Sequence, residues 1–343
     1  MNGIFPNQLL SGPRGRRLIL ELACARNEKL EELMFANVMN ELDSGGRARI
    51  VVELARSTAQ IEQSPPDEFE LLLALRESVS RAMYWQAPDT EDELLAHPSI
   101  VAALRPLAAI LAPLCPTWWT SPMAPGQRRI QDPEGMDLDS NASWQAGAGI
   151  RQWYQAALAE ELHSQDFIPD PQANYTGMWW STPAHPSIPA TTQVLGELGP
   201  VALWAQEDQI NADYAVSYPI SLIGPCRVLE IATAQDYVNL VEKYPLRMTR
   251  SRLHDWYRVT GVSDEWFIPH WGLIAKEYEA VHLTTAGYLE TATRRLQVAG
   301  GSTMLAGWSP DVTYWIGNCA VAGGRPEEWQ HTKGGTTNLW LAA

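Results

Sequence analysis

The tryptophans of this chain lie almost entirely on one side of residue 116. Trp85 is the only one of the 15 tryptophans in the first 116 residues. There, Leu, Ala, Glu and Arg dominate, and apolar residues recur three and four positions apart over Arg17–Val52 and Asp67–Ala112, which is the spacing of a helix face. From Trp118 onward, Gly, Pro and Thr separate short apolar runs, a pattern typical of strands joined by turns. The sequence therefore predicts two regions of different secondary structure.

The length of 343 residues exceeds the usual size of a single core. We expect an α+β protein with a helical domain at 1–116, a linker or boundary at 117–142, and a Trp-rich domain at 143–343. The second domain is expected to be mixed and mainly antiparallel β, with helices. In the first, Asp67 and Glu70 have the spacing of a capping box, and the steps before Pro98 and Pro106 are expected to interrupt the helices.

Charge and hydropathy exclude several classes of partner. The net charge is −15, and the arginines occur in short, scattered groups, so binding to nucleic acid or to an anionic membrane is not expected. No apolar run approaches the length of a membrane span, and the N-terminus does not read as a secretory signal, which predicts a cytoplasmic location. A small-molecule ligand is the expected partner, and the helical domain offers a surface for another protein or a second copy.

The cysteines and glycines lack the spacings of common functional sites. The four cysteines, Cys24, Cys115, Cys226 and Cys319, are far apart and form no C-x-x-C pair, so we expect four reduced, mostly buried thiols and no metal. The chain also lacks a G-x-x-x-x-G-K loop, a G-x-G-x-x-G turn and a G-x-S-x-G elbow. These absences disfavour ATP hydrolysis, dinucleotide oxidoreductase chemistry and serine hydrolase chemistry.

A Trp-Trp-hydroxyl-hydroxyl-Pro pattern occurs twice, at 118–122 and at 179–183. We expect Met178–Ser181 to be a strand, with Trp180, Ser181 and Thr182 at its end. Paired tryptophans bury a large area in a core, and they also form platforms on which planar ligands stack. The pattern leaves both roles open for Trp180.

The densest polar cluster spans Arg250–Arg258 and shows no clean periodicity. It holds His254, Asp255, Trp256, Tyr257 and Arg258 in succession. Aromatic faces beside arginines are typical of the rim of a site that binds a phosphate or carboxylate. The alternative is a loop that Trp256 anchors and in which Asp255 neutralises an arginine.

Glu277 and Glu279 precede the apolar run Ala280–Leu283, which predicts a strand. Two carboxylates at i and i+2 on entry to a strand point to one side, where one can orient a substrate while the other stabilises positive charge. The alternative is that both are solvated residues at the end of a helix.

Arg151, the Ser181-Thr182 step and Glu277 with Glu279 occur in the order that resembles the arginine–serine–glutamate ADP-ribosyltransferases, over residues 151–315. The resemblance implies that the protein consumes NAD as a substrate. It implies that Glu279 stabilises the ribosyl cation as nicotinamide leaves, that Glu277 acts on the acceptor side, and that the two hydroxyls support the NAD site. Arg151 departs from the pattern because it lies in a predicted helix, and a full Ser-Thr-Ser is missing.

Three functions follow as expectations. The first is NAD cleavage by an enzyme of ADP-ribosyltransferase type, in which Trp180, Trp256 and Tyr257 stack on the rings of NAD, Arg258 meets the pyrophosphate and His254 borders the site. The second is a non-enzymatic protein that binds a ligand or protein in an aromatic cleft. The third is a metal-dependent hydrolase built on His254, Asp255 and His282. Segments at 254–261, 278–289 and 307–315 also look like a group of actinobacterial proteins, which brings no activity.

Overall fold

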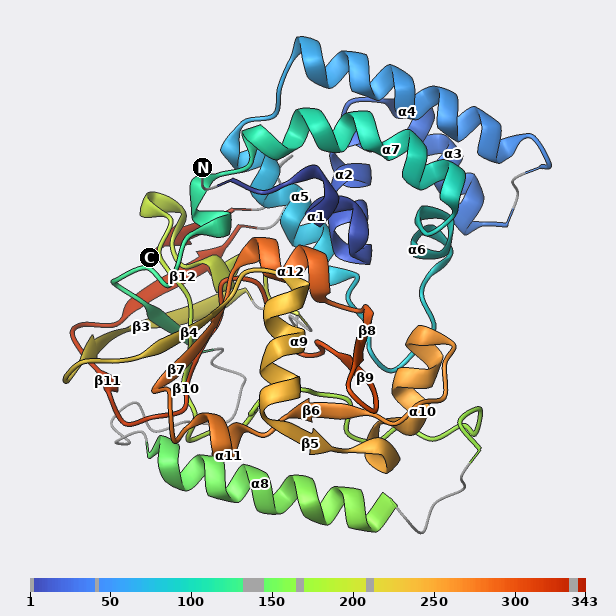
Figure 1. Ribbon diagram of the computed structural model, residues 1–343. Coiled ribbons are helices and arrows are strands. Elements are labelled where there is room, and N and C mark those ends of the chain that lie inside the picture. Colours follow the sequence, from blue (N-terminus) through green and yellow to red (C-terminus); the bar gives the residue numbers. More distant parts are fainter. Residues whose placement is uncertain (1–2, 41–42, 132–144, 165–169, 208–212, 333–338) are drawn as a thin grey trace.

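Helices occupy the first part of the chain, and strands mixed with helices occupy the rest (Figure 1). The computed structural model describes residues 3–40, 43–131, 145–164, 170–207, 213–332 and 339–343. Residues 132–142 of the expected linker therefore lie outside the described residues. The helices of the first part are α1 (Pro6–Ser11), α2 (Pro13–Cys24), α3 (Glu28–Val38), α4 (Gly46–Gln63), α5 (Glu68–Ser80), α6 (Thr90–Leu95) and α7 (Pro98–Leu111).

The expected start of α5 is confirmed, and one expected interruption is wrong. Asp67 accepts a hydrogen bond from the backbone N–H of Glu70, whose side chain accepts one from Asp67, so the capping box is present. The break before Pro98 separates α6 from α7 as expected. Pro106, in contrast, lies inside α7. It sits on the exposed face of a helix whose opposite side buries Leu104 and Leu107, and that burial holds the helix together despite the missing N–H.

Among the described residues, the strands form two larger sheets and the two-stranded pairs β5-β6 and β8-β9. One sheet has the order β1-β3-β12-β13, with β11 also on β3, and the other has the order β2-β10-β7-β4. Only β4 and β7 pair in parallel among these strands, which confirms the expected α+β class with mainly antiparallel sheets. The strands are β1 (Arg128–Gln131), β2 (Ala190–Thr191), β3 (Tyr214–Leu222), β4 (Val228–Ile231), β5 (Pro245–Arg247), β6 (Phe267–Pro269), β7 (Ala280–Leu283), β8 (Arg295–Val298), β9 (Gly301–Met304), β10 (Thr313–Trp315), β11 (Ala320–Ala322), β12 (Glu327–His331) and β13 (Trp340–Ala342).

Five helices accompany these strands: α8 (Ala146–His163), α9 (Ala234–Lys243), α10 (Thr249–Thr260), α11 (Trp271–Ile274) and α12 (Thr285–Thr291). The long helix α8 contacts both α10 and α11 (Figure 1). Two expectations are wrong here. The polar cluster at 250–258 is helix α10 instead of an irregular loop, and residues 178–181 form no strand.

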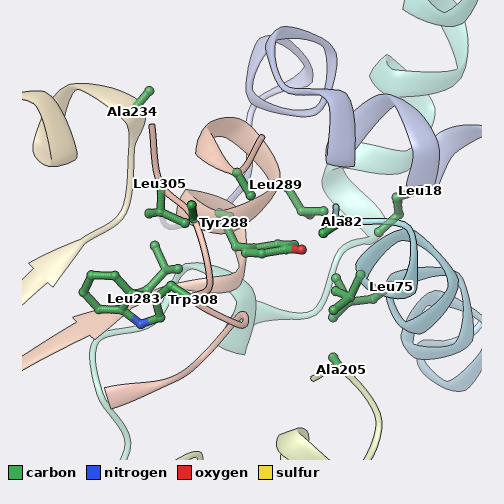
Figure 2. Packing of buried hydrophobic residues seen from close by; sticks show 14 of the residues in the cluster. Leu18, Leu75, Ala82, Ala205, Ala234, Leu283, Tyr288, Leu289, Leu305 and Trp308 are labelled. Atoms are coloured by element: carbon green, nitrogen blue, oxygen red, sulfur yellow. The ribbon is translucent and has the colours of Figure 1, made fainter. Parts of the chain in front are cut away.

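One cluster of buried apolar side chains contains residues from both parts of the chain. The ring of Tyr84 stacks on that of Trp179, with centroids 5.2 Å apart and an interplanar angle of 13°. Figure 2 shows Tyr288 of α12 pointing toward Leu75 and Ala82 of the helical part. Trp119 and Trp179 are both buried in this cluster, so each Trp-Trp pair places one ring in the core. The division into two domains stays a prediction.

Cys226 and Cys319 form a disulfide, so the expectation of four reduced thiols is wrong for this pair. The two cysteines are 93 positions apart in the sequence, yet β11 pairs with the end of β3 and brings their Cα atoms to 6.1 Å. The spacing of the cysteines in the sequence does not indicate that pairing. Cys24 and Cys115 remain free, and burial raises the pKa of the Cys115 thiol to about 12.

Candidate functional site

A cavity of about 660 Å³ opens between α8, α11 and the turn that follows β10. Two residues singled out in the sequence, Arg151 and Glu279, line the same cavity. Tyr154, His270 and Lys276 line it as well. This volume falls within the usual range for small-molecule sites. The cavity is therefore the place where the predicted site residues meet.

Helix α8 places Arg151 and Tyr154 on the cavity side, because residues three and four apart share a helix face. Across the cavity, His270 immediately precedes α11, and its ring stacks on Tyr154 with centroids 4.7 Å apart and an interplanar angle of 23°. Gly147, in the first turn of α8, also lines the space. The first turn of a helix carries partial positive charge, which favours an anion nearby.

Two cationic side chains, Arg151 and Lys276, line the cavity. Within the part of the chain that the structure describes, neither Arg151 nor Lys276 forms an ion pair. Burial, and secondarily the charge of Lys276, lowers the pKa of His270, so its ring is neutral at neutral pH. Its Nδ1 atom is buried and has no hydrogen-bond partner among the described residues. Two unpaired cations and a neutral imidazole thus face one space.

Glu279 presents an ionised carboxylate. Its Oε2 accepts a hydrogen bond of 2.7 Å from the backbone N–H of Arg227, and its Oε1 lies 3.2 Å from Arg227 Nη2. These hydrogen bonds to Arg227 lower the pKa of Glu279. A carboxylate held in this form can stabilise positive charge, but it is a poor proton donor at neutral pH.

The backbone of Glu279 is held by the segment that follows the neighbouring strand β10. The N–H groups of Ile316 and Gly317 donate to its carbonyl oxygen at 3.0 and 2.8 Å. Gly317 allows this close approach, because a Cβ atom there would lie 2.9 Å from Glu279 Cα. Glu279 is therefore fixed between two segments that are distant in the sequence.

Glu277 does not line the cavity. Its carboxylate lies 2.9 Å from Lys243 Nζ on the surface, and the hydrogen bond from Lys243 lowers its pKa. The expected same-side arrangement with Glu279 fails because both residues precede β7, which begins at Ala280, so strand alternation does not apply to them. The two glutamates face different surroundings.

Ser181 and Thr182 are buried behind the cavity wall. The hydroxyl of Ser181 donates to the carbonyl of Ala306 and accepts from its N–H, and Thr182 donates to the carbonyl of Gly307. The indole of Trp271, in α11, donates to the carbonyl of Ser181. These contacts join the segment to its neighbours, and neither hydroxyl reaches the cavity lining.

Trp180 packs beside Trp179, with ring centroids 4.6 Å apart. Its ring also lies against Gly307, which has a φ of 72° and where a Cβ would come within 2.2 Å of Trp180 Cδ1. Trp180 is half-buried and does not line the cavity. Its predicted stacking on a cofactor ring has no counterpart at this cavity.

The aromatic residues of α10 also lie elsewhere. Trp256 is fully buried, and its indole donates to the carbonyl of Trp179. His254 is 4% exposed, and the hydroxyl of Tyr257 accepts a hydrogen bond from Gln172. None of the three lines the cavity. They stabilise the packing of α10 instead.

Three charged residues of α10, Arg252, Asp255 and Arg258, make polar contacts within the fold. Arg258 lies 2.9 Å from the carboxylate of Asp255 and donates to the carbonyl of Tyr175. Arg252 is buried and donates to the carbonyl of Trp180 at 2.7 Å. The sequence shows these residues as a dense polar cluster, but the partners that bury them come from distant segments. No arginine of α10 lines the cavity.

Sequence reasoning missed Tyr154, His270 and Lys276. The spacing of Tyr154 could have indicated it, since Tyr154 follows Arg151 by three positions in a predicted helix and therefore shares its face. No sequence pattern indicated His270 or Lys276, because these residues lie near α8 only in the folded chain. His282, named for the metal alternative, lies apart on β7, where its Nδ1 is 2.6 Å from Glu230 Oε2. Burial opposes its charge, but the nearby carboxylates of Asp311 and Glu230 raise the pKa of His282 to about 9.

Comparisons with known proteins and two observations on the described residues bear on the possible functions. Comparison of the chain with protein-family models, curated proteins and solved structures finds no match. Among the residues that the structure describes, no group of three or more His, Cys, Asp or Glu side chains could hold a metal ion. In the same residues, no helix is long and apolar enough to cross a membrane.

Proposed function

We propose that the cavity between α8 and α11 binds a small organic anion that carries a flat ring. The observation that carries this proposal is the combination of Arg151 and Lys276, both without an ion pair among the described residues, with the Tyr154–His270 ring pair in one cavity of about 660 Å³. Arginine binds phosphate or carboxylate through paired hydrogen bonds. Aromatic rings stack on planar ligands.

The same cavity constrains the rest of the ligand. The carboxylate of Glu279 repels a second anionic group but accepts hydrogen bonds from hydroxyls. A ligand with an acidic group, a flat ring and hydroxyls between them satisfies all of these groups. A nucleotide belongs to this chemical class.

An Arg151→Ala protein should bind the dye anilinonaphthalene sulfonate, a flat-ringed anion, about tenfold or more weakly than the wild type. The physical reason is the loss of a charge-assisted hydrogen bond in a partly enclosed site. Fluorescence titration measures the dissociation constant. Arg49→Ala is the matched control, because Arg49 is exposed on α4 and lies outside the cavity. Unchanged affinity in Arg151→Ala and in Lys276→Ala would contradict the proposal.

A second candidate function is cleavage of NAD at this cavity, and the presence of Glu279 beside Arg151 favours it. In that reaction the bond between the ribose and nicotinamide breaks, and nicotinamide leaves with the bonding electrons. The ionised Glu279 stabilises the ribosyl cation. Water or an acceptor hydroxyl then bonds to the cation and loses a proton. Glu277 has no part in this scheme, since it pairs with Lys243 outside the cavity.

The purified protein should release nicotinamide from NAD at a rate proportional to protein concentration. Chromatography of the reaction mixture measures the product. Competition between NAD and the dye distinguishes the binding function from the enzymatic function. Displacement of the dye by NAD without release of nicotinamide would leave a binding protein and would rule out the enzyme.

A further inference from the structure

Two segments hold Glu279, and each contains a cysteine of the disulfide. Arg227, which donates to the Glu279 carboxylate, directly follows Cys226. Ile316 and Gly317, whose N–H groups donate to the Glu279 carbonyl, come shortly before Cys319. The Cys226–Cys319 bond therefore joins the two sides between which Glu279 is held.

Noncovalent contacts also join these sides, because β11 pairs with the end of β3 and Cys226 and Val228 pack against the cluster that contains Cys319. Cys319 belongs to a small buried cluster with Ala280, Trp315 and Ala320, separate from the main core. On the other side, residues 221–225 are exposed, and Cys226 itself is only half-buried. A backbone hydrogen bond from Ile223 to the carbonyl of Cys319 bridges the two sides, in a segment where water competes for the same groups. The disulfide adds a covalent link at this point.

We infer that Arg227 is the positioning residue of Glu279, and that the Cys226–Cys319 disulfide makes this positioning, and with it ligand binding in the cavity, dependent on redox state. The ligand-binding part rests on the proposed function. The positioning part rests on the contacts of Glu279 alone.

The chemistry needs a thiol reductant. A thiolate attacks the half-buried Cys226 sulfur, and the Cys319 sulfur leaves with the bonding electrons and takes up a proton. A second thiol then attacks the mixed disulfide, which releases Cys226 as a thiol and the reductant as its own disulfide. Reducing compartments keep such thiols available. Reduction removes the covalent restraint on the exposed segment that leads into Arg227. The Arg227 carbonyl then keeps only its hydrogen bonds from the N–H groups of Glu279 and Ala280, while Cys319 stays in its buried cluster.

Hydrogen exchange tests the positioning without any ligand. The N–H groups of Arg227, Ile316 and Gly317 should be protected in the oxidised protein and should exchange at least about tenfold faster after treatment with dithiothreitol. Peptides from α5 serve as an internal control. A thiol count of two before reduction and four after it verifies each state. Equal exchange in both states would overturn the inference.

Dye binding tests the consequence for the cavity. Reduction, or Cys226→Ser, should weaken binding of anilinonaphthalene sulfonate about fivefold or more, and reoxidation of the wild type should restore it. Cys115→Ser, which removes a free thiol, is the matched control. Arg227→Ala removes the guanidinium contacts but keeps the backbone N–H donor, so reduction should cause a smaller further loss in this variant than in the wild type, whereas Arg227→Lys should recover part of the affinity. A purely structural disulfide would weaken both backgrounds equally, which would contradict the role of Arg227.

The two proposals fail in different ways. If the oxidised protein does not bind the dye but its exchange pattern changes on reduction, the proposed ligand site is wrong and the positioning of Glu279 by Arg227 stands. If the dye binds equally in both states and exchange is unchanged, the ligand site stands and the redox inference is wrong.

Discussion

A Glu279→Gln protein is expected to release nicotinamide from NAD about 100-fold or more slowly than the wild type, if the cavity cleaves NAD. The amide has nearly the same size but no charge, so the ribosyl cation loses its counter-charge. The backbone N–H of Arg227 can still donate to the amide oxygen, and the fold should therefore persist. Single-turnover kinetics measure the effect, and circular dichroism verifies folding.

Glu277→Gln is the matched control for this measurement. Glu277 lies two positions away but pairs with Lys243 on the surface, so the rate of the Glu277→Gln protein should stay within about twofold of the wild type.

The pH dependence of nicotinamide release provides a further test of Glu279. Because the pKa of Glu279 is lowered from 4.5, the carboxylate stays ionised well into mildly acidic solution, and protonation of Glu279 should slow the reaction only below pH 4.5. Equal rates in wild type and Glu279→Gln would exclude Glu279 from the chemistry.

Replacing Glu207 with Ala should lower the free energy of unfolding by about 2–5 kcal/mol, because two buried hydroxyls lose an acceptor. The carboxylate accepts hydrogen bonds of 2.6 Å from Tyr84 and 2.9 Å from Tyr288. Glu207 is 7% exposed, and both tyrosines are fully buried. The substitution therefore weakens a contact that joins the helical part to α12.

Urea denaturation measures this loss as a lower transition midpoint. Glu197→Ala is the control, since Glu197 is exposed and should change stability by less than about 0.5 kcal/mol. Removing the donors together with the acceptor, in Glu207→Ala with Tyr84→Phe and Tyr288→Phe, should cost less than the sum of the separate changes. An unchanged midpoint in Glu207→Ala would show that the two hydroxyls find other acceptors.

Local signals predicted much of the fold. Asp67 and Glu70 form the expected capping box of α5, and the apolar run at 280–283 is strand β7. These features depend on neighbours in the sequence. Helix α10 was missed because its buried Arg252 and Asp255 obscure the apolar periodicity, and their partners lie far away in the chain. Residues 178–181 were misread for a similar reason, since their apolar rings pack in the core without forming a ladder.

The candidate site was only partly predictable. Arg151 and Glu279 were named from the order of motifs, and the structure places both at one cavity. Their expected companions Ser181 and Trp256 are instead used in the packing behind it. A motif gives residue types in order, but the side on which each residue faces depends on the tertiary contacts around it. The disulfide beside Glu279 was invisible for the same reason.

The stack of Tyr84 on Trp179 has a practical consequence for anyone who shortens the chain. A fragment that starts at residue 143 would keep every residue of the cavity lining but would expose to water the ring faces of Trp179 and Tyr288 that the helical part now covers. Large apolar patches exposed in this way promote aggregation. Failure of such a fragment to bind a ligand would therefore report on its solubility rather than on the cavity.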